Sequence, residues 1–105
     1  MIITTTPNIE GFPVKQYLGI VNSETIIGAN ILKDVMANLR DFFGGRNNTY
    51  EKSFRTAVET ALKELEQQAL ARGANAVVGV KVDYEVVGAS GSMLMATCVG
   101  TAVLI

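Results

Sequence analysis

The chain holds few side chains that could do chemistry. It contains no histidine and a single cysteine, Cys98. Zinc and copper sites usually take three or four donors, mostly thiolate or imidazole. One copy of this chain supplies only one such donor, the Cys98 thiol. Serine and threonine hydroxyls also have no histidine that could activate them as nucleophiles. These counts argue against a transition-metal centre within one chain and against a hydrolase triad.

Three residues remain as candidate metal ligands: Cys98, Asp83 and Glu85. Asp83 and Glu85 are two apart on a predicted strand, so their carboxylates share a face and could hold a hard cation together with neighbouring groups. Met93 and Met95 could offer two thioethers to Cu(I), but by the same parity Cys98 lies on the opposite face. The simpler interpretations are a solvated strand face, methionines that fill a core, and a small buried thiol.

The best candidate for ligand binding is the segment from Gly44 to Glu51. Gly44 and Gly45 leave the backbone free to approach an anion, and Arg46 adds a positive charge at the start of a predicted helix. Tyr50 and Glu51 follow in the first turn of that helix. The segment lacks the GxxxxGK[ST] pattern of a phosphate loop, so a helix end, a turn and a new helix start explain it equally well.

Residue patterns predict the elements that position these groups. Apolar residues at helical spacing predict one helix from Asn30 to Phe43 and a second over residues 49–72, which ends at Gly73. On the second helix, three oppositely charged pairs four residues apart are expected on the exposed side: Glu51–Arg55, Arg55–Glu59 and Glu59–Lys63. Strands are expected at residues 2–6, 14–27, 75–87 and 93–105. The predicted fold is α+β, in the order β-β-α-α-β-β, with an antiparallel sheet packed against two helices.

Period-two alternation predicts which strand residues share a face. Val78 and Val80 are expected on one face with Val82, Tyr84 and Val86, opposite Lys81, Asp83 and Glu85. In the 14–27 strand, Leu18 and Ile20 are expected opposite Tyr17, Gly19 and Val21.

The last twenty residues, Val86–Ile105, carry no charged side chain. A small monomer seldom hides both faces of such a strand, so this run predicts a subunit interface.

Bulk properties exclude several classes of protein. A length of 105 residues predicts a single domain, 1–105. The net charge is −1 and the basic residues are scattered, so we expect no nucleic-acid partner. One cysteine cannot form an internal disulfide, and the N-terminus lacks the pattern of a signal peptide. These features predict a cytoplasmic protein without a membrane span.

Many short motifs resemble the YbjQ family of small bacterial proteins over essentially the whole chain. They include Thr4–Gly11, Tyr17–Val21, Gly28–Asn30, Asp41, Gly44–Arg46, Tyr50-Glu51, Gly73–Gly79, Asp83–Glu85, Gly91–Met93 and Gly100–Val103. The resemblance implies a compact α+β fold that assembles into ring-shaped homo-oligomers, as pentamers. The family is uncharacterised in function and carries the label "putative heavy-metal-binding domain". A metal ion is therefore the cofactor that the resemblance suggests, although the ligand inventory does not support one.

The sequence thus predicts a non-enzymatic homo-oligomeric domain that binds a small ligand or ion. Two alternatives remain open. One is an enzyme with a carboxylate and arginine site at subunit boundaries; the other is a purely structural assembly module.

Overall fold

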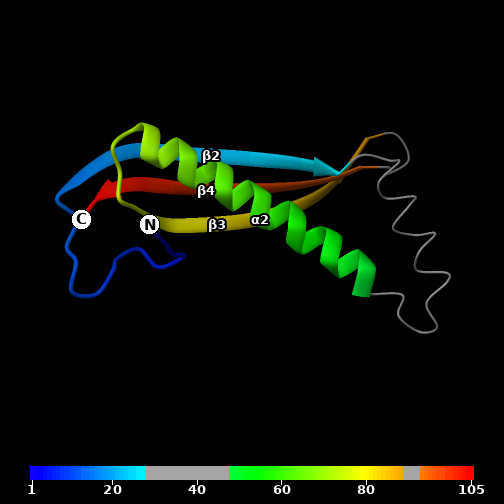
Figure 1. Cartoon of the computed structure of the whole chain (residues 1–105), viewed down its shortest axis with the longest axis horizontal. Helices are drawn as coiled ribbons and strands as arrows, with labels where there is room; N and C mark the ends of the chain where they lie inside the picture. Colours follow the sequence, from blue (N-terminus) through cyan, green and yellow to red (C-terminus); the bar gives the residue numbers. More distant parts are fainter. Residues whose placement is uncertain (28–47, 89–92) are drawn as a thin grey trace.

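The computed structural model describes residues 1–27, 48–88 and 93–105. They form strands β1 (Ile2–Ile3), β2 (Gln16–Ile27), β3 (Ala76–Val87) and β4 (Met93–Leu104), and one helix, α2 (Asn48–Ala71). The strands make one sheet in the order β1-β3-β4-β2. The helix crosses one face of this sheet, mainly over β2 and β4, and leaves the other face of the sheet without a helix from the described residues (Figure 1).

Small side chains allow α2 to lie close to the sheet. Ala57, Ala61, Leu65 and Ala69 recur every four residues on its buried side. They meet a mostly small face of β4 that contains Leu94, Ala96, Cys98 and Ala102. Small residues on both surfaces therefore let the helix and the strand approach closely. No helix among the described residues combines the length and the apolar character that crossing a bilayer requires.

The helix ends where the sequence predicted. Gly73 adopts a φ of 82°, and its N–H donates to the carbonyl of Leu70 at 3.0 Å. The N–H of Ala74 reaches back to the carbonyl of Ala69, also at 3.0 Å, which completes a Schellman motif. Ala69 and Ala74 belong to the same buried cluster, so this cap also brings the chain back onto the core.

The uncharged strand β4 lies in the middle of the sheet, between β3 and β2. One of its faces packs under α2. At its C-terminal end the other face contributes Val103 to a second cluster with Ala76 and Val78, which Ile9 and Val14 help to cover. Much of the uncharged character of this strand therefore follows from a central position within one chain, and its edges are not available to a partner.

Two glycine bulges change which residues share a face. The register with β4 shifts between Tyr17 and Gly19 in β2, and between Val78 and Lys81 in β3. Gly19 and Gly79 both have positive φ, 102° and 62°. An extra residue in a strand reverses the parity beyond it.

The predicted alternation is consequently wrong at both bulges. Val78 packs in the cluster on the side away from the helix, whereas Val80 packs beneath the helix. In β2, Leu18 packs against the same core as Val21, while Ile20 points to the opposite side and is exposed.

Two features of the predicted topology also differ from the structure. The sheet is mixed rather than antiparallel, because β1 pairs parallel with β3, Ile2 opposite Ala76 and Ile3 opposite Val77. The described elements follow the order β-β-α-β-β with one helix, so the predicted order β-β-α-α-β-β with two helices is not matched. The predicted helix from Asn30 to Phe43 falls within residues 28–47, outside the described residues.

Candidate functional site

The predicted ligand segment lies largely beyond what the structure describes. Gly44, Gly45 and Arg46 fall within residues 28–47. Tyr50 and Glu51 occupy the first turn of α2, where the course of the backbone is described but the side chains are not. The geometry of this candidate site therefore stays a prediction.

Cys98 is fully buried beneath α2. It lies opposite Ser23 of β2 and Val82 of β3. Burial raises the pKa of the Cys98 thiol, and a hydrogen bond with the Ser23 side chain partly offsets this rise in pKa. Ser23 in turn donates its hydroxyl to the carbonyl of Ala61 at 2.5 Å. A thiol held protonated in such a place is a poor nucleophile and a poor metal ligand.

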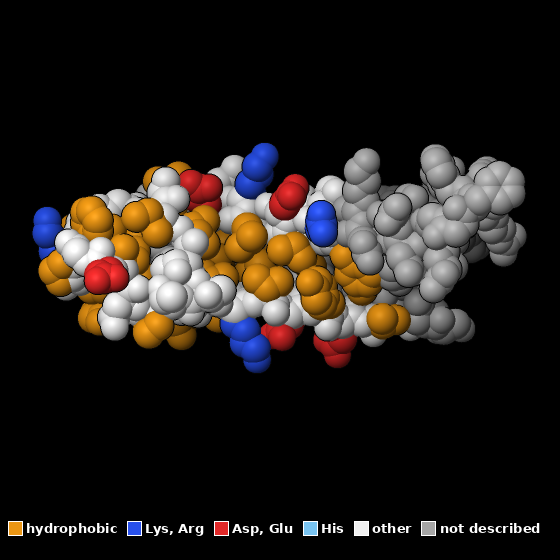
Figure 2. Space-filling view, turned by 90° about the horizontal axis from the view of Figure 1, so that it is seen from below, with side chains coloured by type: hydrophobic (Ala, Val, Ile, Leu, Met, Phe, Trp, Pro, Cys, Tyr) orange, Lys and Arg blue, Asp and Glu red, His pale blue; other side chains and the backbone are white. Residues whose placement is uncertain are grey.

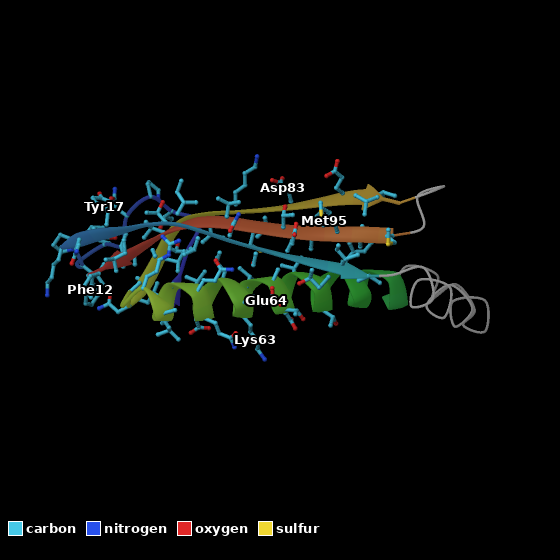
Figure 3. All side chains as sticks on the ribbon, turned by 90° about the horizontal axis from the view of Figure 1, so that it is seen from above. Phe12, Tyr17, Lys63, Glu64, Asp83 and Met95 are labelled. Atoms are coloured by element: carbon cyan, nitrogen blue, oxygen red, sulfur yellow. The ribbon has the colours of Figure 1, made fainter. Side chains whose placement is uncertain are left out.

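Asp83 and Glu85 lie on the other face of the sheet from Cys98. Asp83 is opposite Thr97, whereas Cys98 is opposite Val82. Figure 3 shows Asp83 and Met95 on the side of the sheet away from α2. The Asp83 carboxylate lies 3.6 Å from Nζ of Lys81, and both side chains are exposed. The three predicted metal ligands therefore do not converge within one chain.

The described residues offer no alternative metal site. None of their histidine, cysteine, aspartate and glutamate side chains form a group of three that could hold an ion. A cavity of about 530 Å³ includes Cys98, Glu24 and Glu64 in its lining, together with Gln68, and still provides no such group. This donor set does not fit a heavy-metal ion.

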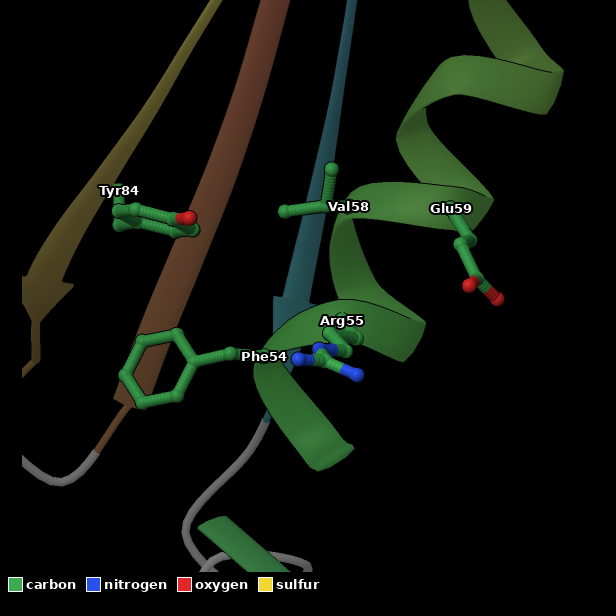
Figure 4. Close-up of a pocket in the computed structure, with 5 residues that line it drawn as sticks. All are labelled: Phe54, Arg55, Val58, Glu59 and Tyr84. Atoms are coloured by element: carbon green, nitrogen blue, oxygen red, sulfur yellow. The ribbon is translucent and has the colours of Figure 1, made fainter. Parts of the chain in front are cut away.

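A larger cavity, of about 610 Å³, opens between α2 and β3. Its described lining comprises Phe54, Arg55, Val58, Glu59 and Tyr84 (Figure 4). Phe54 and Tyr84 meet edge to face, with ring centroids 5.4 Å apart and an interplanar angle of 86°. Sequence reasoning missed this site, because Phe54 of α2 and Tyr84 of β3 lie on separate elements and nothing local signals that they meet.

Several exposed apolar side chains lie on the face of the sheet opposite α2, which we call the open face. Ile20 and Ile26 of β2 are 69% and 53% exposed, and Val99 of β4 is 45% exposed. Ile26 lies opposite Met95, which is half-buried. No described element covers these residues.

Two comparisons with known proteins agree with this architecture. The model of the YbjQ family, described as "putative heavy-metal-binding", matches residues 1–105. A crystal structure from Pediococcus pentosaceus, of a protein of unknown function in the DUF74 family, is similar with a TM-score of 0.68. The match covers 100% of this chain and 97% of that one at 21% identity, and at this identity it supports the fold alone.

Proposed function

We propose, from the premise that the chain belongs to the YbjQ family, that it is a cytoplasmic homo-oligomeric domain that binds a small ligand or ion and performs no chemistry of its own. The subunits form a closed ring. Five is the subunit number that the family resemblance implies.

The open face is the observation that carries this proposal. Burying an apolar side chain of this size stabilises by about 1.5–3 kcal/mol when it passes fully from water to a packed interior. In a single chain much of this stabilisation is missing for three side chains that remain exposed, those of Ile20, Ile26 and Val99. The three residues share the open face with the exposed charged pair of Lys81 and Asp83, and a mixture of apolar and charged side chains is also found at interfaces between proteins. A second copy that packs against this face would recover the lost burial.

The ligand part of the proposal rests on the cavity between α2 and β3. Its volume falls in the range of small-molecule sites, roughly 300–1,000 Å³. The family description points instead to a heavy metal, but the donors among the described side chains do not fit such an ion. No observation favours the enzymatic alternative over binding.

The assembly can be tested by sedimentation velocity and native mass spectrometry on the wild type and on Val99→Asp. We expect a closed oligomer for the wild type and its dissociation in the variant, because an unpaired charge buried at an interface is costly. Val86→Asp is the matched control, since Val86 is also an exposed strand valine but lies outside the open face. A monomeric wild type, or an unchanged oligomer in Val99→Asp, would contradict the proposal.

A further inference from the structure

We infer that the cavity between α2 and β3 binds a small aromatic carboxylate. This inference deepens the ligand-binding part of the proposed function and does not depend on the proposed assembly. Three features of the cavity carry it: its aromatic walls, its single cation, and the uncovered side of the molecule on which it opens.

The walls of the cavity suit a flat apolar ligand. Phe54 reaches from α2 toward Tyr84 on β3, and Val58 lies one helical turn beyond Phe54 (Figure 4). Although its ring contacts Phe54, Tyr84 remains 58% exposed. The structure therefore leaves aromatic surface bare inside a concave site, where a second ring could stack offset or edge to face.

The charge of the cavity favours an anion. Arg55 is the one cation in the described lining. The expected pair with Glu59 is not formed: among the described residues, no carboxylate lies within 4.0 Å of the Arg55 guanidinium. Figure 4 shows Glu59 directed away from the aromatic pair. An arginine that has no carboxylate partner among the described side chains and lies beside an apolar cavity can bind a carboxylate ligand through two parallel hydrogen bonds.

The cavity is accessible because β3 is poorly covered on this side. Strand β1 and the residues after it bond to β3 as far as Val80, where the Val80 N–H donates to the carbonyl of Thr4. Beyond Val80 the outer edge of β3 pairs with no described strand. Figure 2 shows hydrophobic side chains along this side of the molecule, with charged side chains above and below them. A ligand can enter from here without displacing a described element.

The experiment compares two probes with the same ring system, 1-naphthoate and 1-naphthalenemethanol, by isothermal titration calorimetry on the whole protein. We expect the wild type to bind the carboxylate about tenfold or more tightly than the alcohol, as a charge-assisted hydrogen bond implies. In Arg55→Gln the affinity for naphthoate should fall to that for the alcohol, while the affinity for the alcohol stays unchanged. Tyr84→Ala should lower the affinity of the protein for both probes.

Lys63→Gln is the matched control, because Lys63 is exposed on the same helix and lies outside the cavity lining. It should leave both affinities unchanged. Equal affinity of the wild type for the two probes, binding of neither, or undiminished preference for naphthoate in Arg55→Gln would overturn the inference. Binding of neither probe would also agree with a different occupant, such as an extended peptide on the β3 edge.

Sedimentation of the same samples separates this inference from the proposed assembly. An intact oligomer that binds the two probes equally would contradict the inferred ligand, an aromatic carboxylate, and would leave the proposed assembly standing. A monomer that prefers naphthoate through Arg55 would overturn the assembly and leave the ligand site standing.

Discussion

Cys98 shows how the environment of one residue decides its chemistry. As the only cysteine it was a natural candidate metal ligand, yet it lies at 0% exposure under α2. Its neighbours across the sheet are Ser23 and Val82, and neither is a carboxylate. Burial raises the pKa of the thiol and so favours its neutral form. In this structure Cys98 packs as a small apolar residue.

The raised pKa of Cys98 predicts a loss of stability in alkaline solution. In the unfolded chain the thiol titrates near its ordinary pKa of about 8.5, and in the folded protein it titrates at higher pH. Above pH ~8.5 the unfolded state therefore binds fewer protons than the folded state, and the free energy of unfolding falls as pH rises. Below that pH this contribution is fully present.

Urea denaturation of the wild type and Cys98→Ser at pH 7 and pH 9 measures the effect. The variant should keep the native circular dichroism and lose about 1–3 kcal/mol at pH 7, the cost of burying a hydroxyl. Its further loss between pH 7 and pH 9 should be smaller than that of the wild type. Equal losses in the two proteins would show that the thiol does not contribute.

At the scale of elements, the two bulges set how the strands fit around β4. Arg72, which follows α2, occupies the space beside Gly19: a Cβ atom on Gly19 would lie 2.6 Å from Arg72 Nη1. The same nitrogen donates a hydrogen bond to the carbonyl of Leu18 at 3.1 Å. At the other bulge, the Gly79 N–H donates to the carbonyl of Thr6 at 2.8 Å. Each bulge is thus stabilised by a segment distant in sequence.

Gly100 of β4 lies against the β3 bulge and should not tolerate a side chain. A Cβ at this position would come within 2.7 Å of Val77 Cγ1 and 3.0 Å of Val80 Cγ2. We expect Gly100→Ala to lower the free energy of unfolding by about 1–3 kcal/mol through overpacking. Thermal and urea denaturation would measure the loss.

A second substitution tests the cause. Val77→Ala removes the nearest methyl group, so the double variant should lose less stability than the sum of the two single variants. If the double variant instead loses the full sum of the two single losses in free energy of unfolding, the contact with Val77 is not the reason that alanine is excluded at position 100.

At the scale of the whole molecule, the helix that the structure describes, α2, covers one face of a four-stranded sheet. Because α2 lies over β2 and β4, it leaves the helix-side face of β3 partly bare at Tyr84 and Val86. It also leaves the open face uncovered on the opposite side of the sheet. The two exposed apolar regions lie on different sides of the sheet, so the proposed assembly and the proposed ligand would not compete for one surface.

Removal of metal should leave this molecule intact. The described core is apolar, with no buried charged side chain, and no group of described side chains could hold an ion. We expect the melting temperature and the sedimentation coefficient to be unchanged after extensive dialysis against EDTA. Unfolding or dissociation on chelation, as occurs when metal drives folding, would show that a metal site links the fold or the subunits.

Local patterns in the sequence were sufficient to predict much of the fold. The four-residue spacing of Ala57, Ala61, Leu65 and Ala69, followed by Gly73, predicted α2 and its end. Alternation predicted β3, β4 and the burial of Cys98 on the face opposite Met93 and Met95. Helix spacing, capping and strand alternation act over a few residues, so they can be read directly from the chain.

The tertiary structure decided three features that the sequence did not reveal. They are the parallel pairing of β1 with β3, the parity changes at Gly19 and Gly79, and the contact between Phe54 and Tyr84. Each depends on contacts between segments far apart in the sequence, such as Arg72 with Leu18 or Gly79 with Thr6. A glycine in a strand permits a bulge but does not require one; the partner that fills the space determines whether it forms. The sequence by itself therefore determined where α2, β2, β3 and β4 form, whereas long-range packing determined which faces they present and where the cavity lies.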